Sequence, residues 1–353
     1  MTLKNEQSAA VRTLLSQLPK VDLHVHLDGS VKPETLRELA NEQGNPLSVS
    51  SHEELINHMQ VSEHCESLTE YLSKFSYVLP YLQTGAALER AAFEVVEQAA
   101  MQRIHYIEVR FAPQLHRMEG LTLHEVIDYV IHGLQRGEQA FGMTARAIII
   151  CMRNHSYDLN KDVVLEAARF YKKGVVAVDL AGDEASYPAE LFQQLFADVR
   201  QHGMPATIHA GEAAGAENVK VAITSLGAVR IGHGVRMLED PEVVSLVKER
   251  QIPLEMCPLS NLQTKAVPSW DAYPLRRYLE QGIAVTVNTD NMTVSDTTIQ
   301  KEYELLMEHL GLSLTEVAHL IMNGVRAAFL TGSEKDSLIR RYEKELRALG
   351  LEV

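Results

Sequence analysis

Short apolar segments rich in β-branched residues alternate along this chain with longer amphipathic segments. The apolar segments are at most eight residues long, and most end in Gly, Pro, Asp or Asn, which is typical of buried parallel strands. The predicted strands are Val21–Leu27, Ile104–Phe111, Ala145–Cys151, Val175–Leu180, Ala206–Ala210, Val229–His233, Ile252–Cys257 and Ile283–Asn288.

The segments between the later strands have helical periodicity. In Tyr187–Gln201, four apolar side chains share one helical face: Leu191, Leu195, Phe196 and Val199. Pro241–Arg250 begins with a proline, which suits the first turn of a helix. Strands that alternate with helices in this way predict an α/β protein with a (β/α)₈ barrel, and an open doubly wound sheet is the alternative.

The chain has 353 residues, whereas ~250 are typical of a (β/α)₈ barrel. The additional residues fall in two places. Residues 33–103 form a predicted helical insertion after the first strand, and residues 295–353 form a predicted block of C-terminal helices. The predicted helices of the insertion are Pro33–Gly44, Glu53–Gln60, Ser67–Tyr77 and Ala86–Gln102. No Gly/Ser/Pro-rich linker divides the sequence, so we expect a single domain over residues 1–353.

The composition is that of a globular protein, with 46% hydrophobic and 23% charged residues. The formal net charge is −14, from 33 Lys and Arg and 47 Asp and Glu. An excess of negative charge disfavours nucleic acid and anionic membranes as partners, because both attract clusters of Lys and Arg.

The lack of a recognisable targeting signal and the pattern of cysteines predict a cytoplasmic protein. The N-terminus has no apolar core of the kind that a signal peptide needs, and the longest apolar runs fall far short of the ~20 residues that cross a bilayer. Cys65, Cys151 and Cys257 are widely spaced and form no CxxC motif, so we expect reduced thiols.

Polar side chains gather where the predicted strands end, which is where barrel enzymes place their active sites. The first strand contains His24 and His26, which point to the same side because side chains alternate along a strand, and Asp28 continues that row. Two such imidazoles can bind zinc. Taken alone, the pair is weak evidence for a metal site, because two hydrogen-bonded histidines on a half-exposed strand would give the same pattern.

Three other predicted strands end in residues of the same kind. His209 and Glu212 follow the fifth strand, His233 lies between two glycines at the sixth, and Asp290 follows the eighth. Each has a structural explanation by itself, such as a helix cap for Asp290. Their occurrence at four strand ends of one barrel favours a shared site, in which three histidines and one aspartate would bind a metal ion and leave a position for water.

Several other chemistries are excluded as motifs. The sequence contains no GxSxG, no HExxH and no complete P-loop. The H-x-E and P-C-x-x-C signature of one class of zinc deaminase is also absent, because Cys257 is followed by Pro-Leu-Ser.

Six segments together resemble the adenosine deaminase family of the amidohydrolase superfamily, in the order of that family. They are His24-Val-His26-Leu-Asp28-Gly29-Ser30, Asp179-Leu-Ala-Gly182-Asp-Glu184, His209-Ala-Gly-Glu212, Ile231-Gly-His233-Gly, Cys257-Pro-Leu-Ser-Asn261 and Asn288-Thr-Asp290. The resemblance extends from the first strand to the C-terminal helices.

The resemblance implies a site residue by residue. One zinc ion per chain would be held by His24, His26, His209 and Asp290. As the catalytic pair, Glu212 would donate a proton to purine N1, and His233 would orient or deprotonate the water bound to zinc.

The resemblance also implies substrate contacts. Gly182 would offer its backbone N–H to purine N3, and Asp28 would bind a ribose hydroxyl. Asn291 stands where the family commonly has a second aspartate that donates to purine N7, and an asparagine amide can also donate there. The insertion at 33–103 would supply part of a hydrophobic lid.

The implied reaction is zinc-dependent hydrolytic deamination of adenosine and 2′-deoxyadenosine to inosine and 2′-deoxyinosine, with release of ammonia, as in purine salvage. The partner would be a small purine nucleoside. Elementary chemistry agrees with this scheme. Zinc lowers the pKa of bound water to about 7, and a buried carboxyl such as Glu212 can remain protonated to serve as the acid.

Related substrates remain open. Adenine deaminases usually have Glu where this chain has Asp28, and Asp where it has Gly232, so both positions favour a nucleoside. Asn291 leaves the exact preference undetermined, with an N6-modified nucleotide or free adenine as alternatives. A nucleotide would need a basic pocket, and Lys32 is the single cationic residue next to Asp28 in the sequence.

Two other classes of function remain as alternatives. A catalytically silent metal-binding barrel would have no need for Glu212 and His233. A two-metal amidohydrolase usually needs a bridging lysine near the end of the fourth strand, whereas Lys172 and Lys173 precede that strand. The sequence does not determine the oligomeric state.

Overall fold

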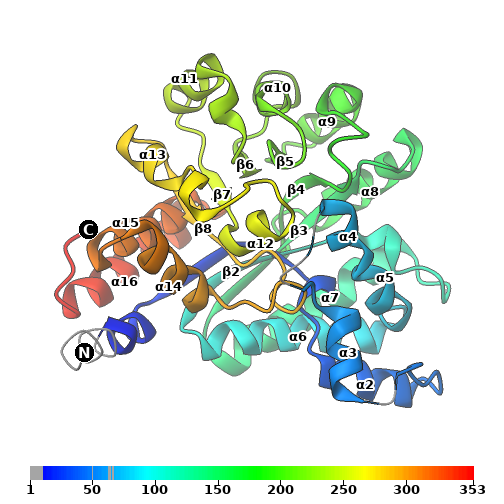
Figure 1. Cartoon of the computed structure of the whole chain (residues 1–353). Coiled ribbons are helices and arrows are strands. Elements are labelled where there is room, and N and C mark those ends of the chain that lie inside the picture. Colours follow the sequence, from blue (N-terminus) through cyan, green and yellow to red (C-terminus); the bar gives the residue numbers. More distant parts are fainter. Residues whose placement is uncertain (1–10, 50, 63–64, 66) are drawn as a thin grey trace.

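Eight parallel strands form the centre of the molecule (Figure 1), and all eight predicted strands are confirmed. The computed structural model describes residues 11–49, 51–62, 65 and 67–353; the N-terminal residues that lack a signal motif lie outside these ranges. The strands are β1 Lys20–His26, β2 Ile104–Phe111, β3 Thr144–Met152, β4 Val175–Ala181, β5 Thr207–Ala210, β6 Arg230–His233, β7 Leu254–Met256 and β8 Val285–Val287.

The strands close into a barrel. They pair in the orders β1-β2-β3-β4 and β5-β6-β7-β8. A bridge between Val178 and Ala206 joins β4 to β5, and a bridge between Val25 and Asp290 joins the segment after β8 to β1. Since both gaps are bridged, the fold is the predicted (β/α)₈ barrel and not an open doubly wound sheet.

Helices surround the strands (Figure 1). After the insertion, they are α7 Leu123–Phe141, α8 Tyr157–Phe170, α9 Gln193–Gln201, α10 Ala216–Val221, α11 Pro241–Glu249, α12 Pro258–Gln263, α13 Leu275–Glu280, α14 Ile299–Leu310, α15 Leu314–Ala327 and α16 Gly332–Ala348. Local sequence explains their limits. At the start of α7, for example, Thr122 and Glu125 form a reciprocal capping box, and Gly142 ends the helix with φ 66°.

The predicted helix over Tyr187–Gln201 is only partly correct. Its first turns form a 3₁₀ helix at Ala189–Phe192, and α9 begins at Gln193. Because a 3₁₀ helix has three residues per turn, Leu191 rotates away from the core and is 63% exposed. The rest of the predicted apolar face, Leu195, Phe196 and Val199, is buried.

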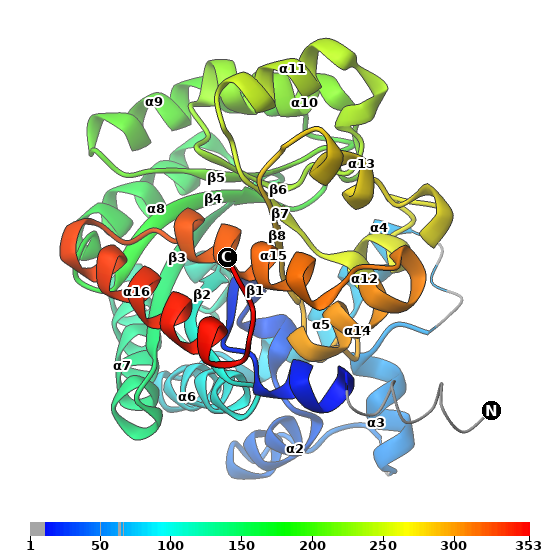
Figure 2. The same ribbon diagram turned by 90° about the vertical axis from the view of Figure 1, so that its left-hand side faces the viewer.

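The insertion after β1 is helical, as predicted. It comprises α2 Pro33–Glu42, α3 His52–Met59, α4 Leu68–Ser73, α5 Phe75–Val78 and α6 Gly85–Met101. The single helix predicted over Ser67–Tyr77 is divided into α4 and α5 at Lys74. Both short helices lie at the same end of the barrel as α12, which follows β7 (Figures 1 and 2). They therefore lie near the carboxyl ends of the strands.

The C-terminal helices complete the outer layer. Helix α15 packs against β8 and β1, and α16 packs against α15. In the part of the chain that the structure describes, no helix is long and apolar enough to cross a membrane. All three cysteines are buried and free of disulfide bonds, as expected.

Charged side chains occupy the barrel interior. The Arg110 guanidinium lies 2.8 Å from Asp179 and 2.7 Å from Glu255. Arg230 lies 2.6 Å from Glu255 and also pairs with Glu108. All five side chains are buried. These ion pairs lie along the barrel interior, between its base and the strand ends where the predicted site lies.

Lys20 provides a test of the buried charges at the base of the barrel. Its ammonium donates to the carbonyls of Leu18 and Gln102, and burial lowers its pKa to about 7, with a contribution from Arg103. Between pH 7 and the ordinary lysine pKa, the unfolded chain therefore binds more protons than the folded one. The contribution of Lys20 to the free energy of unfolding should rise with pH across this interval.

We expect the free energy of unfolding to depend less on pH in Lys20→Met than in the wild type. Chemical denaturation at pH 7, 8.5 and 10 measures the free energy of unfolding of both proteins. In the difference between the two, the contributions of the titrating groups that they share cancel. Parallel pH profiles for the two proteins would contradict the assignment.

Candidate active site

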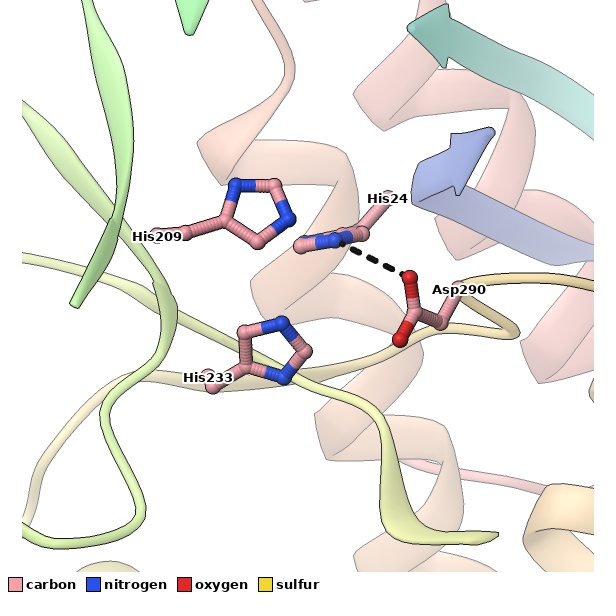
Figure 3. A group of neighbouring side chains, drawn as sticks. All are labelled: His24, His209, His233 and Asp290. Atoms are coloured by element: carbon pink, nitrogen blue, oxygen red, sulfur yellow. Dashed lines mark ion pairs between the residues drawn. The ribbon is translucent and has the colours of Figure 1, made fainter. Parts of the chain in front are cut away.

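Four side chains from distant parts of the sequence meet at the carboxyl ends of the strands. His24 lies in β1, His209 lies in β5, His233 ends β6 and Asp290 follows β8; one potential ligand atom from each lies within 4.8 Å of the others. All four side chains are buried and point toward one another (Figure 3). Such a group of imidazoles and a carboxylate can hold a divalent metal ion.

His26 lies beside this group. The sequence analysis expected His26 among the metal ligands, whereas the closest group contains His233 in its place. Nevertheless, His26 Nε2 is 3.3 Å from Asp290 Oδ1, and His24 Nε2 is 3.5 Å from the same oxygen. The backbone of Asp290 explains this convergence, because its N–H donates to the carbonyl of His24 and its carbonyl accepts from the N–H of His26.

Hydrogen bonds on the far side of two rings orient them toward the centre of the cluster. His24 Nδ1 is 3.0 Å from Glu255 Oε2, and His209 Nδ1 is 3.0 Å from Asp179 Oδ2. Each Nδ1–H can donate to its carboxylate, which leaves the lone pair of Nε2 free for a metal. Nε2 of His24 is buried and has no hydrogen-bond partner.

His233 has the opposite arrangement. Tyr273 donates its hydroxyl to Oδ1 of Asn261 at 3.1 Å, so the Asn261 amide N–H points to His233 Nδ1 at 2.9 Å. Because Nδ1 then accepts, Nε2 carries the proton and lies 3.5 Å from Glu212 Oε2. In this tautomer His233 is a hydrogen-bond donor toward the cavity and not a ligand.

The charges in the barrel interior fit a divalent cation. Arg110 pairs with Asp179 and Glu255, and Arg230 pairs with Glu255 and Glu108, whereas Asp290 faces His24 and His26. Burial opposes ionisation of Glu255, but Arg110 and Arg230 hold the pKa of this carboxyl well below its usual range. Within this group the carboxylates outnumber the arginines, and no ion pair in the described part of the chain joins Asp290 to Lys or Arg, which suits a divalent metal ion.

The backbone at two of these residues is strained. His233 has φ 65° and Asp290 has φ 60°, in the left-handed region that residues other than glycine rarely adopt. Strained residues of this kind occur preferentially at functional sites. Both lie at the points where their chain segments leave the barrel, and the strain turns their side chains toward the common centre.

A cavity of about 520 Å³ opens next to the cluster. Its lining includes the other predicted site residues Asp28, Gly182, Glu212 and Asn291. Apolar walls come from the insertion and from the strand ends: Leu68, Leu72, Phe75, Leu79, Leu115, Ile150 and Met152. A larger cavity of about 960 Å³ is lined by Arg146 and Phe329 at the opposite end of the barrel and contains none of the predicted site residues.

Two buried carboxyls in the cavity have raised pKa values. Burial raises the pKa of Glu212 well above its usual range, and the negative charges of Asp290 and Glu184 add to this effect. Burial also raises the pKa of Asp28 to about 6. The raised pKa of Glu212 favours its protonated form, in which it can act as an acid, and Asp28 can accept a hydrogen bond.

Asn291 is partly engaged by the insertion. Its amide nitrogen donates to the Tyr71 hydroxyl at 3.0 Å, and this hydroxyl is 2.6 Å from Ser295 Oγ. The second amide hydrogen of Asn291 remains available, and its Oδ1 is buried without a partner. Gly182 lies directly after β4, with φ 108°.

The sequence analysis assigned no role to several residues that hold the site in place. Glu255 and Asn261 orient His24 and His233, and Ser260 donates to Asp290 Oδ2 at 2.6 Å. A carboxylate in the middle of the apolar strand Ile252–Cys257 was a usable signal, because a buried charge requires a partner. Tyr71 gave no such signal, since its contact depends on how the insertion packs.

The fold and the site together define a class of protein: a (β/α)₈ barrel with a metal-binding cluster at the carboxyl ends of its strands, as in metal-dependent hydrolases. Comparisons with known proteins agree. Residues 19–345 match the family model described as "Adenosine deaminase". An adenosine deaminase of Clostridium botulinum (strain Okra) is 44% identical over 333 residues, which cover 94% of this chain and 99% of the relative.

Solved structures are also similar. An adenine deaminase from Arthrobacter aurescens superposes with a TM-score of 0.87 at 27% identity, over 94% of this chain and 99% of that one. A zinc-bound amidohydrolase from Burkholderia ambifaria has a TM-score of 0.87 at 25% identity, over 97% of this chain and 95% of that one. The chain belongs to the adenosine deaminase family.

The carboxylate behind His209 can be tested through metal affinity. We expect Asp179→Asn to weaken zinc binding about 10–100-fold, the usual effect of losing a carboxylate that orients a histidine ligand. Competition with a chelator measures the zinc affinity, and circular dichroism verifies the fold. An unchanged affinity would show that His209 does not need this carboxylate to bind metal.

Proposed function

We propose that this protein catalyses the zinc-dependent hydrolytic deamination of adenosine and 2′-deoxyadenosine to inosine and 2′-deoxyinosine, with release of ammonia. One observation carries the proposal. Glu212 is a buried carboxyl with a raised pKa, and it lies 3.5 Å from Nε2 of His233 in a cavity beside the metal-binding cluster. Glu212 as an acid and His233 as a hydrogen-bond donor thus line one cavity that is large enough for a small substrate.

Zinc is the proposed metal, with one ion per chain held by His24, His26, His209 and Asp290. The free Nε2 of His24, the net negative charge of the barrel interior and the zinc in the related amidohydrolase support this choice. When bound, zinc makes hydroxide available at neutral pH. His233 is left outside the ligand set because its Nδ1 accepts from Asn261.

The acid–base roles follow from the protonation states. Addition of hydroxide to the amino-bearing carbon of the purine places negative charge on ring nitrogen N1, and protonated Glu212 neutralises it. His233, with its proton on Nε2, orients the attacking water by donating a hydrogen bond. The tetrahedral carbon then collapses: the hydroxyl proton passes to the amino group, the C–N bond breaks, the carbonyl of inosine forms, and ammonia leaves.

The remaining site residues are proposed to bind the nucleoside. Asp28 accepts from a ribose hydroxyl, the Gly182 N–H donates to N3, and the free amide hydrogen of Asn291 donates to N7. Leu68, Leu72 and Phe75 belong to the insertion at 33–103 and line the cavity, so we assign them to a lid that excludes water during the reaction.

The lining of the cavity favours a nucleoside over a nucleotide. Among the described residues that line it, none is Lys or Arg. Lys32, the cation nearest to Asp28 in the sequence, instead pairs with Glu97 at 3.0 Å. A substrate phosphate would therefore enter the cavity without a counter-charge, which argues against an N6-modified nucleotide. Free adenine would leave buried Asp28 without the hydroxyl that it is proposed to bind.

The proposed setting is purine salvage, and a cytoplasmic location stays a prediction. A catalytically silent metal-binding barrel remains the alternative from another class. It is less consistent with Glu212, because burial of this carboxyl in a cavity is costly and a silent barrel would have no use for its raised pKa.

The loss of adenosine absorbance as inosine forms provides the direct test. We expect the zinc-loaded protein to turn over adenosine and 2′-deoxyadenosine. Glu212→Gln should keep zinc binding but lose about 10²–10⁴-fold in kcat, which is the usual contribution of an acid or base. The function is wrong if the zinc-loaded wild-type protein leaves adenosine unchanged, and the role of Glu212 is wrong if the variant retains full activity.

A substrate panel tests the preference for nucleosides. We expect kcat/KM for AMP and N6-methyl-AMP to be at least about 100-fold below that for adenosine, because binding would desolvate a phosphate without a cationic partner. Adenine should also be a poor substrate. Comparable values for AMP and adenosine would favour the nucleotide alternative.

A further inference from the structure

The segment that carries Glu212, residues 211–214 between β5 and α10, is held by one buried side chain. Glu184 lies in the loop after β4 and is 1% exposed. Four consecutive backbone N–H groups donate to its carboxylate: Gly211 to Oε1 at 2.7 Å, and Glu212, Ala213 and Ala214 to Oε2 at 3.0, 2.7 and 3.0 Å.

The backbone of this segment explains why the four N–H groups converge. Gly211 has φ 70°, and a Cβ there would lie 2.7 Å from a methyl group of Val219, so only glycine fits. The chain turns sharply at this point and presents successive N–H groups to one side, which is the geometry of an anion-binding nest. Helix α10 begins later, at Ala216, and offers these groups no alternative partner.

Both carboxylate oxygens of Glu184 accept hydrogen bonds from the backbone of this loop. No ion pair within 4 Å joins Glu184 to a cationic side chain in the described part of the chain. The Arg153 guanidinium attracts the Glu184 carboxylate electrostatically from beyond this distance. Its own hydrogen bonds go to the carbonyls of His209 and Tyr187. The carboxylate of Glu184 therefore makes its hydrogen bonds to residues 211–214, and its charge also contributes to the raised pKa of Glu212.

We propose that Glu184 is a positioning residue for the reaction: it holds the backbone of residues 211–214 so that the Glu212 side chain points into the cavity next to His233. The inference rests on the proposed function, in which Glu212 is the acid. Glu184 itself does not touch the substrate. Glu184 acts by determining the position of the proton donor, Glu212.

The substitution Glu184→Gln tests this role. It replaces one acceptor oxygen by an NH₂ group, so at least one backbone N–H of the loop loses its acceptor. We expect kcat to fall about 100-fold, the scale associated with a misplacement of ~1 Å in an active site, while KM and zinc content change little. A purely structural role would instead reduce folded protein and zinc content together with kcat.

Glu138→Gln is the matched control. Glu138 also accepts a backbone N–H, from Ala145 at 2.8 Å, but it lies at the opposite end of the barrel, among the residues of the larger cavity. This variant weakens a backbone hydrogen bond and an ion pair with Arg146 away from the site, so its kcat should equal that of the wild type.

Hydrogen exchange gives a readout that does not depend on activity. Amides of residues 211–214 should exchange at least about 10-fold faster in Glu184→Gln than in the wild type, and at the wild-type rate in Glu138→Gln. If the wild type fails to deaminate adenosine, the proposed function is wrong, yet the exchange data still decide whether Glu184 holds the loop. Unchanged exchange, or a wild-type kcat in Glu184→Gln, overturns the inference.

Should Glu184→Gln fail to fold, Glu184→Asp replaces it. The shorter side chain keeps the charge and part of the hydrogen bonding, so kcat should fall by a smaller factor with KM unchanged, and exchange at 211–214 should rise. A change in KM alone would overturn the inference.

Discussion

The candidate site depends on one cation, Arg110, inside the barrel. Its guanidinium lies 2.8 Å from Asp179 and 2.7 Å from Glu255, and the same two carboxylates face Nδ1 of His209 and His24. One side chain from β2 thereby aligns histidines on β5 and β1. Without this cation, buried Asp179 would lose its arginine partner and Glu255 would keep only Arg230, so the two carboxylates that orient the histidines would be less firmly held.

Such a network is costly to build, because each buried charge loses its hydration. Removing one partner of a buried ion pair costs about 3–5 kcal/mol, whereas apolar replacements of the whole group are often neutral. The interior of this barrel therefore reflects the requirements of the site more than those of stability. Its remaining negative charge suits a divalent cation, so metal binding and folding should be coupled.

Most of the fold could be predicted from the sequence. All eight strands lie within two residues of the predicted bounds, because parallel strands buried on both faces appear as short, continuous apolar runs. The exposure of Leu191 and the division of Ser67–Tyr77 into two helices could not be predicted. Both depend on local backbone geometry, which apolar periodicity does not report.

The sequence by itself determined which chemical groups stand at the strand ends: His24, His26, His209, His233 and Asp290, with Glu212 close by. Strand period and strand order suffice for this, since parallel strands bring their carboxyl ends together. Only the tertiary structure decided what each group can do. The tautomer of His233 comes from Asn261, and the loop of Glu212 is held by Glu184, because hydrogen bonds between residues distant in sequence leave no local pattern.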